Sequence, residues 1–109
     1  MTVYTLGDWQ VKPGQIEQFV TTWRELTESS LAEVEPDARV VLLRDTECAG
    51  HFYSIGEFCD DETIVQHRDG CVLGARVSGL AALLEHGQTS VLSVVDVIGD
   101  VSLRAPSVR

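Results

Sequence analysis

The residues best able to do chemistry lie in one stretch, FYSIGEFCDDETIVQHR, which runs from Phe52 to Arg68. Its first part, Phe52 to Phe58, is short, aromatic and β-branched, which predicts a strand. The acidic residues from Asp60 to Glu62 suit the first turn of a helix, where unpaired N–H groups and the helix dipole favour carboxylates. His67 follows at helical spacing, on the face that would turn back toward the sheet. This strand and helix therefore form the one candidate site that the sequence offers clearly.

Size and charge limit the class of protein. A chain of 109 residues forms one domain that can bury about two-thirds of its unfolded surface. Its net charge of −9 repels nucleic acid phosphates and anionic membrane surfaces, so we expect neither as a partner. No apolar segment is long enough to span a bilayer, and the first residues lack the features of a signal peptide. The sequence therefore predicts a cytoplasmic location.

The cysteines and histidines do not have the spacing of a metal site. The three cysteines are predicted to be reduced thiols that pack as small hydrophobic residues. Two histidines, His51 and His86, are predicted to lie in loops and to take no part in chemistry. We expect no metal and no cofactor. The cysteines are Cys48, Cys59 and Cys71.

Periodicity predicts the first half of the fold. Residues 3–11 alternate as in a strand, and Pro13 and Gly14 then form a turn. From Gln15 the period becomes helical, and an apolar stripe runs along one face to Val34. Residues 39–44 (RVVLLR) predict a second strand. The stripe consists of Ile16, Phe19, Val20, Trp23, Leu26, Thr27, Leu31 and Val34.

The second half of the chain predicts a helix and a fourth strand. The helix that carries His67 is expected to loosen near Gly70 and Gly74 and to end with a cap at His86 and Gly87. Residues 91–98 (VLSVVDVI) predict a strand that is apolar on both faces. Residues 1–99 would form the domain. Residues 100–109 would be a tail that is loose or packed on a partner subunit.

The predicted order is strand, helix, strand, strand, helix, strand. This is the ferredoxin-like α+β class, with a four-stranded antiparallel sheet and both helices on one face. The other face would carry valine and leucine side chains from the second and fourth strands, an apolar patch too large to stay in water. We therefore predict a homodimer that forms through the open face of the sheet.

The sequence also resembles a known family. Residues 9–14 (WQVKPG), followed by Phe19 and Trp23, are similar to the opening of the antibiotic biosynthesis monooxygenase (ABM) domain family. Residues 57–67 resemble the second motif of the family, an acidic residue and Trp that end the third strand, and His one turn into the next helix. The likeness covers about residues 3–98. It implies a dimeric α+β barrel with one pocket per subunit, between the sheet and its helices.

The best-known activity in this family is oxygenation of electron-rich aromatics, such as anthrones or hydroquinones, without metal or flavin. The sequence departs from the family pattern at Phe58, which replaces the motif Trp, and it lacks the second His that often follows His67. Haem degradation, found in one branch, is disfavoured because Gly7 and Val77 stand where that branch has Asn and a His ligand.

The resemblance also suggests roles for individual residues. His67 would act as the general base that deprotonates a phenol or an acidic C–H group. Trp9 and Trp23 would lie on either side of a flat ring. The other candidates for substrate binding are Gly7, which would leave room for the ring, Phe58, Tyr53 as a weaker hydrogen-bond donor, and Arg68 or Arg44 as a cation beside a phenolate. Asp8 and Glu57 are expected to be surface or strand-end carboxylates.

Two other functions remain open. One is an isomerase or dehydratase of a small carbonyl compound that uses the same base, for which turnover would continue under argon. The other is a non-catalytic ligand-binding or assembly domain of the same fold. Phe58 in place of Trp and the missing second His favour the latter.

Overall fold

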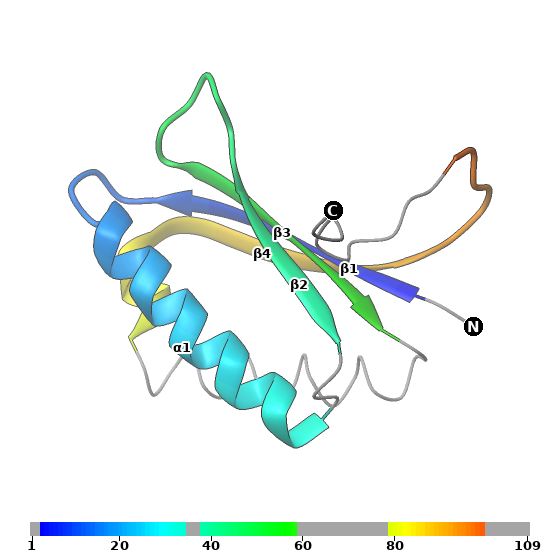
Figure 1. Cartoon of the computed structure of the whole chain (residues 1–109). Coiled ribbons are helices and arrows are strands. Elements are labelled where there is room, and N and C mark those ends of the chain that lie inside the picture. The colour runs from blue at the N-terminus through cyan, green and yellow to red at the C-terminus, as the bar shows by residue number, and fades with distance from the viewer. Residues whose placement is uncertain (1–2, 35–37, 59–78, 100–109) are drawn as a thin grey trace, which may run out of the picture.

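The computed structural model describes residues 3–34, 38–58 and 79–99. Four strands and two helical segments lie in these ranges, and they confirm the predicted α+β fold (Figure 1). The predicted second helix, with His67 and Arg68, and the predicted tail at 100–109 lie outside the described residues. The elements are β1 (Val3–Val11), α1 (Ile16–Val34), β2 (Arg39–Arg44), β3 (His51–Phe58), the 3₁₀ turn η1 (Leu80–Leu83) and β4 (Leu84–Ser93).

The four strands form one antiparallel sheet in the order β2-β3-β1-β4. β1 and β3 are the central strands, and β2 and β4 are the edges. The register places Gly7 opposite Ser54 on β3 and opposite Thr89 on β4. Because side chains alternate along each strand, this register decides which residues of β1 and β3 share a face.

α1 covers one face of the sheet (Figure 1). Its apolar residues recur every three or four positions, as predicted, and direct one stripe toward the strands. Phe19 is fully buried, with its ring centroid 5.2 Å from that of Phe52 on β3. Val11 and Leu80 complete this cluster, which is the main part of the core. A smaller cluster of Val3 and Phe58 lies at the other end of the sheet.

The start of β4 corrects the sequence prediction. The end of the expected helix, which was to run through Leu84, is instead the short turn η1 over residues 80–83, and β4 begins at Leu84. The backbone N–H of Lys12 donates to the carbonyl oxygen of Leu83, and Nζ of Lys12 donates to that of Ala82. These two bonds hold the turn against the end of β1. His86 and Gly87, the predicted helix cap, therefore lie in β4, opposite Gln10 and Trp9.

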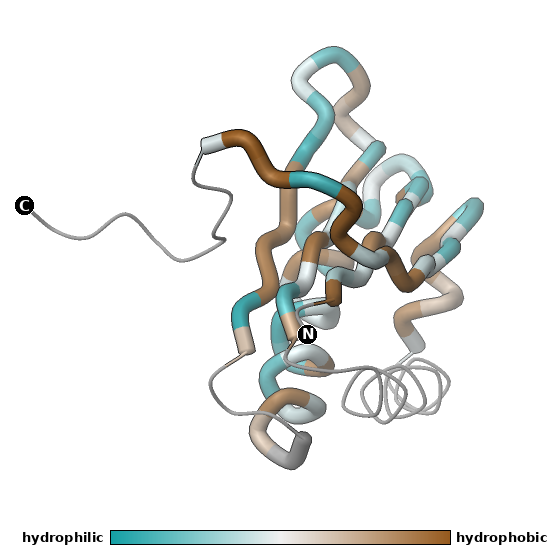
Figure 2. The backbone as a smooth tube through the Cα atoms, turned by 90° about the vertical axis from the view of Figure 1, so that its right-hand side faces the viewer, coloured by the Kyte–Doolittle hydropathy of each residue, from teal (hydrophilic) through white to brown (hydrophobic). Residues whose placement is uncertain are grey.

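The end of β4 differs as well. The predicted strand reached Ile98, but β4 ends at Ser93, which pairs with Val3 at the start of β1. Residues 94–98, here called the arm, continue beyond the sheet, where no described strand pairs with them (Figure 1). Figure 2 shows that the arm is largely hydrophobic. Val95 is 95% exposed and Ile98 is 92% exposed.

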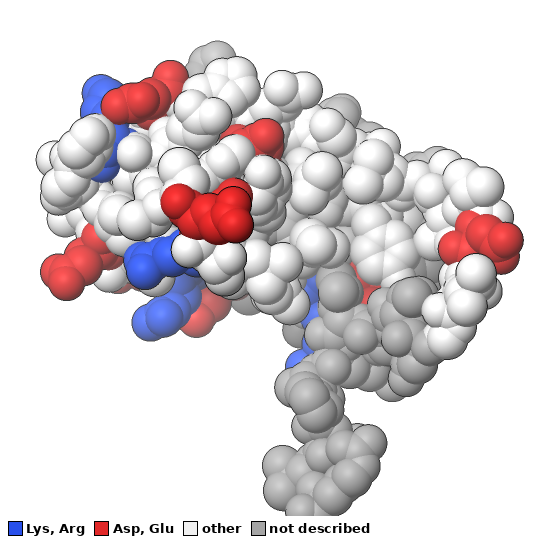
Figure 3. Space-filling model, turned by 90° about the horizontal axis from the view of Figure 1, so that it is seen from above, with Lys and Arg blue, Asp and Glu red and all other residues white. Residues whose placement is uncertain are grey.

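The face of the sheet away from α1 has no covering element among the described residues. Its apolar residues are Leu6 on β1, Val41 and Leu43 on β2, Ile55 on β3 and Leu92 on β4. In the view from above, most charged side chains lie toward one end and few lie in the middle (Figure 3). No helix in the described ranges is long and apolar enough to cross a membrane.

Candidate functional site

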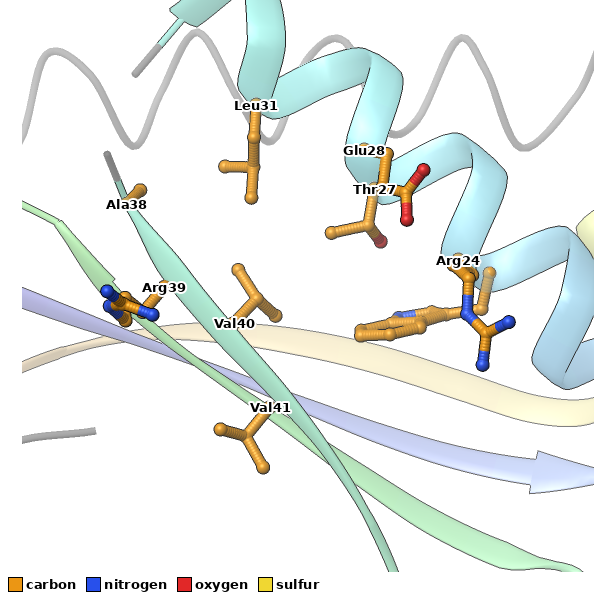
Figure 4. A pocket seen from close by; sticks show the side chains of 9 residues that line it. Arg24, Thr27, Glu28, Leu31, Ala38, Arg39, Val40 and Val41 are labelled. Carbon is orange, nitrogen blue, oxygen red and sulfur yellow. The ribbon is translucent and has the colours of Figure 1, made fainter. Parts of the chain in front are cut away.

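A cavity of about 460 Å³ lies between α1 and the edge strand β2. Thr27 and Leu31 extend from the helix toward it, and Val40 extends from the strand on the opposite side (Figure 4). More of its surface is apolar than polar. The lining residues are Trp23, Arg24, Thr27, Glu28, Leu31, Ala38, Arg39, Val40 and Val41. Most cavities that bind small organic ligands are mainly apolar, with a few polar groups that fix the orientation of the ligand.

The sequence explains why this space stays open. Leu31 and Trp23 are large, but Thr27 between them on the helix and Ala38 just before the strand are short. The side chains of the two elements therefore do not fill the gap between them. Val41 points away from α1, as its place in the strand alternation requires (Figure 4).

Charged groups lie only at the rim of the cavity. Arg24 and Glu28 are exposed on α1, and Arg39 is exposed on β2. In the described part of the chain, Arg24 and Arg39 form no ion pair. Both residues are cations in the cavity lining of a chain whose net charge is −9.

The sheet beneath α1 contains a hydrogen bond from Trp9 to Ser54. The indole Nε1 donates to Oγ of Ser54 over 3.0 Å, and the Trp9 ring lies 6.4 Å from that of Phe19. Gly7 packs directly against this bonded pair. A Cβ atom at Gly7 would lie 2.5 Å from Nε1 of Trp9, and closer still to Oγ of Ser54. The absent side chain at Gly7 therefore leaves room for the indole of Trp9.

The predicted site residues fall into three groups. Gly7, Trp9, Trp23 and Phe58 all lie on the side of the sheet that α1 covers, but only Trp23 lines the cavity. Tyr53 lies on the opposite face. Arg44 lies with its guanidinium 5.1 Å from the ring centroid of Phe52, outside the cavity lining. His67 and Arg68 lie outside the described residues.

One polar pair on the open face was missed. His51 was expected in a loop, but it is the first residue of β3, and its Nε2 lies 2.6 Å from Oδ1 of Asp8 on β1. Its ring also stacks on Tyr53, with the centroids 4.6 Å apart. A carboxylate beside one ring nitrogen fixes the orientation and tautomer of an imidazole. Among the described residues, no cluster of His, Cys, Asp and Glu could hold a metal ion.

Only the register of β1 and β3 could have predicted that Asp8 and His51 meet. Asp8 and His51 are 43 residues apart, so no local motif connects them. They lie on one face because Asp8 is opposite Tyr53, and His51 is two positions before Tyr53 on the same strand. Such diagonal neighbours in an antiparallel pair lie within reach of long side chains.

The comparison with known families agrees with this geometry. The profile described as antibiotic biosynthesis monooxygenase matches residues 2–71, which is more than half of the chain. The chain belongs to the antibiotic biosynthesis monooxygenase family. The resemblance seen in the sequence is thereby confirmed.

Several solved structures share this fold. SnoaB from Streptomyces nogalater, a cofactor-independent oxygenase, is 18% identical, with a TM-score of 0.73 over 91% of this chain and 98% of SnoaB. A putative antibiotic biosynthesis monooxygenase from Nitrosomonas europaea is 15% identical, with a TM-score of 0.71 over 86% of this chain and 90% of that one. A conserved protein from Methanosarcina mazei Go1 is 18% identical, with a TM-score of 0.69 over 84% and 90% of the two chains. At these identities the likeness shows the fold alone. No curated protein matches the sequence significantly.

Proposed function

We propose that this protein is a cofactor-independent monooxygenase that acts on an electron-rich aromatic compound of the anthrone or hydroquinone type. The observation that carries the proposal is the cavity of about 460 Å³ beneath α1, which has a tryptophan in its wall, in a member of this family. The volume lies within the range of pockets that hold small organic ligands. The similarity to SnoaB is consistent with this activity.

The reaction requires a base and a dry pocket. Removal of a proton from the methylene of an anthrone gives a carbanion that reacts with O₂ and, after protonation, forms a hydroperoxide. Loss of water from the hydroperoxide leaves a ketone. One oxygen atom enters the product and the other leaves as water, and the methylene group supplies all four electrons. No external reductant is therefore needed.

We assign roles to residues on this basis. His67 is the proposed base, as the sequence motif suggests, because imidazole accepts protons near neutral pH. Trp23 is the proposed ring contact, since it lines the cavity. Gly7, Trp9 and Phe58 would support the pocket from the sheet beneath. Arg24, on the α1 side of the cavity lining, could stabilise a developing phenolate.

Oxygen uptake in the presence of a reduced anthrone tests the proposal. Wild-type protein should consume one O₂ per anthrone oxidised, and His67→Ala should lower kcat at least 100-fold, a loss typical of a missing general base. The matched control is His86→Ala, which removes an exposed imidazole on β4, outside the cavity lining. Circular dichroism should show that both variants stay folded. Unchanged turnover in His67→Ala would exclude that residue as the base, and no uptake by wild type with any reduced aromatic would reject the oxygenase.

A second candidate function is non-catalytic binding of a small ligand. The observation in its favour is that Trp9 and Ser54 occupy the space next to Gly7, so part of the interior is filled by the protein itself. This function predicts quenching of tryptophan fluorescence by flat aromatics without oxygen uptake. Turnover that continues under argon would indicate the isomerase instead, because an oxygenase requires O₂.

We also propose that the protein is a homodimer through the open face of the sheet. Leu43, Leu92 and the arm expose large apolar side chains that water would solvate poorly in a single copy. A two-fold axis would place the same patch of each copy against the other. Sedimentation at micromolar concentration should show a dimer, and a monomer would contradict this proposal.

A further inference from the structure

We propose that the association of two copies is coupled to proton uptake by His51, so that the dimer becomes tighter as the pH falls from about 8 to about 6. The basis is the contact between His51 and Asp8, a titratable pair on the face of the sheet that a second copy would cover. The inference rests on the homodimer proposed above and adds a means of regulation to it.

The pair lies next to the apolar part of the open face. Asp8 is two residues from Leu6 along β1, and Tyr53, which stacks on His51, is opposite Leu43 on β2. In a single copy the side chains of His51 and Asp8 are 18% and 42% exposed. A second copy that covers these leucines would therefore also remove water from the imidazole and from the carboxylate.

The hydrogen bond fixes where a proton can be added. An ionised carboxylate only accepts hydrogen bonds, so Nε2 of His51 donates to Oδ1 of Asp8 over 2.6 Å. Nδ1 is then the ring nitrogen that can take up a second proton. The bond to Asp8 and the stacking on Tyr53 both hold the ring, so the added charge stays beside the carboxylate.

Asp45 and His86 are the other titratable residues at this end of the open face. The backbone N–H of Asp45 donates to the carbonyl oxygen of His51 over 2.9 Å, and its Oδ1 accepts a backbone N–H of the following loop. His86 lies on β4 opposite Gln10, just as His51 does on β3. Two strand spacings, or about 10 Å, therefore separate the backbones of the two histidines. Of the two, His51 is the one bonded to Asp8.

The nearby cations are directed elsewhere. Nζ of Lys12 donates to the carbonyl oxygen of Ala82 in η1, and the guanidinium of Arg44 lies over the ring of Phe52, on the side of α1. The remaining titratable or charged residues of the open face lie about 20 Å along the strands from His51, and they are Tyr4, Arg39 and Glu57. Among the described residues, no cation therefore competes with a protonated His51 for its carboxylate partner.

The removal of water decides the direction of the effect. With a neutral imidazole, each covered pair would hold a carboxylate without a compensating charge, which is costly to bury. A proton on Nδ1 converts the contact into an imidazolium–carboxylate pair with no net charge and a stronger hydrogen bond. A two-fold axis brings two such pairs into one interface, between chains of net charge −9, so repulsion acts in the same direction. Association should therefore take up protons.

Sedimentation equilibrium at several pH values and one ionic strength tests the inference. The dimer dissociation constant of the wild type should be at least tenfold lower at about pH 6 than at about pH 8, and circular dichroism should show the same fold at both. A dissociation constant that is equal at the two pH values would reject the inference and keep the homodimer. A monomer at every pH would reject both.

Two substitutions should remove the pH dependence at different levels of affinity. His51→Gln keeps a hydrogen-bond donor but cannot gain a charge, so it should associate at about pH 6 only as weakly as the wild type does at about pH 8. Asp8→Asn removes the carboxylate, so at about pH 8 it should associate at least as tightly as the wild type at about pH 6. A purely structural role of the pair would weaken association in both variants, and that result would overturn the proposal.

The matched control is His86→Gln, the same substitution on the other histidine of this face. It should keep at least a fivefold difference in the dissociation constant between the two pH values, because His86 is not bonded to Asp8. Loss of the pH dependence in this variant instead would identify His86 as the titrating group, and the proposal would be wrong.

Calorimetry counts the protons directly. Dilution of the dimer near neutral pH, in two buffers with different enthalpies of ionisation, gives the number of protons released on dissociation. The wild type should release protons, up to two per dimer because of the two-fold symmetry. His51→Gln should release less than half as many. Dissociation of the wild type without proton release would overturn the inference.

Discussion

Nε2 of His51 lies 2.6 Å from Oδ1 of Asp8, across the two central strands and on the face of the sheet that α1 leaves uncovered. The side chain of His51 is 18% exposed and that of Asp8 is 42% exposed. The pair is therefore partly solvated, and in a single copy its geometry orients the imidazole more than it stabilises the fold. Stacking on Tyr53 holds the same ring from a second side.

A double-mutant cycle should measure a small coupling between these residues. At a concentration at which the protein is monomeric, we expect Asp8→Asn and His51→Gln to show an interaction free energy below about 1 kcal/mol in urea unfolding, because exposed pairs are screened by water. The matched control is a cycle of Asp8→Asn with His86→Gln, on the strand at the other side of β1, which should give a coupling near zero. A coupling above about 2 kcal/mol for the first pair would mean that the pair is more deeply buried in solution.

The hydrogen bond from Trp9 to Ser54 should be worth more, because it lies under α1. Ser54→Ala leaves the indole N–H without an acceptor and should lower the free energy of unfolding by about 1–3 kcal/mol. Adding Trp9→Phe should make the loss from Ser54→Ala smaller, since Phe has no donor to leave unpaired. If the serine substitution costs the same in both backgrounds, the bond does not contribute.

Gly7 should not tolerate a side chain. Gly7→Ala places a methyl group against the indole of Trp9 and Oγ of Ser54, and we expect a loss of about 1–3 kcal/mol in the free energy of unfolding. The double variant Gly7→Ala with Ser54→Ala should lose less than the sum of the two single changes, because Oγ is the nearest atom. Thermal unfolding of the four proteins would measure this, and a neutral Gly7→Ala would show that the space is free.

Phe19 should be the most sensitive residue of α1. Its side chain is fully buried between the rings of Trp9 and Phe52, so Phe19→Ala should cost about 3–5 kcal/mol. Phe19→Leu keeps most of the volume and should cost less than half as much. If Phe19→Ala had the same free energy of unfolding in urea as the wild type, this description of the core would be wrong.

The first half of the fold follows from periodicity. The bounds of β1, α1 and β2 agree with prediction because each element has one buried face, and its apolar residues repeat with a period of two or of about 3.6. β3 was likewise expected, with one residue added at its start. In these segments the local pattern and the tertiary contacts favour the same structure.

The second half shows where this reasoning stops. Residues 84–90 (LEHGQTS) are mostly polar and exposed, and they become a strand because β1 provides hydrogen bonds along one side. The arm is more apolar than β4 itself, yet no strand among the described residues lies beside it. The prediction, which relied on hydrophobicity, therefore placed the strand too far toward the C-terminus. Within the candidate site, the sequence predicted Trp23 as a lining residue. It did not predict that Leu31, Ala38 and Val40 form the rest of the cavity wall, because that space depends on the distance between α1 and β2.

The uncovered valines and isoleucine after β4 affect how the stability of this protein should be measured. If these side chains are buried only by association, folding and association are coupled by mass action, and the midpoint of thermal unfolding rises as the protein is concentrated. Dilution of the protein to below the dissociation constant of the dimer would then lower its apparent stability without any change in sequence. Values of unfolding free energy from different preparations are comparable only at a common molarity.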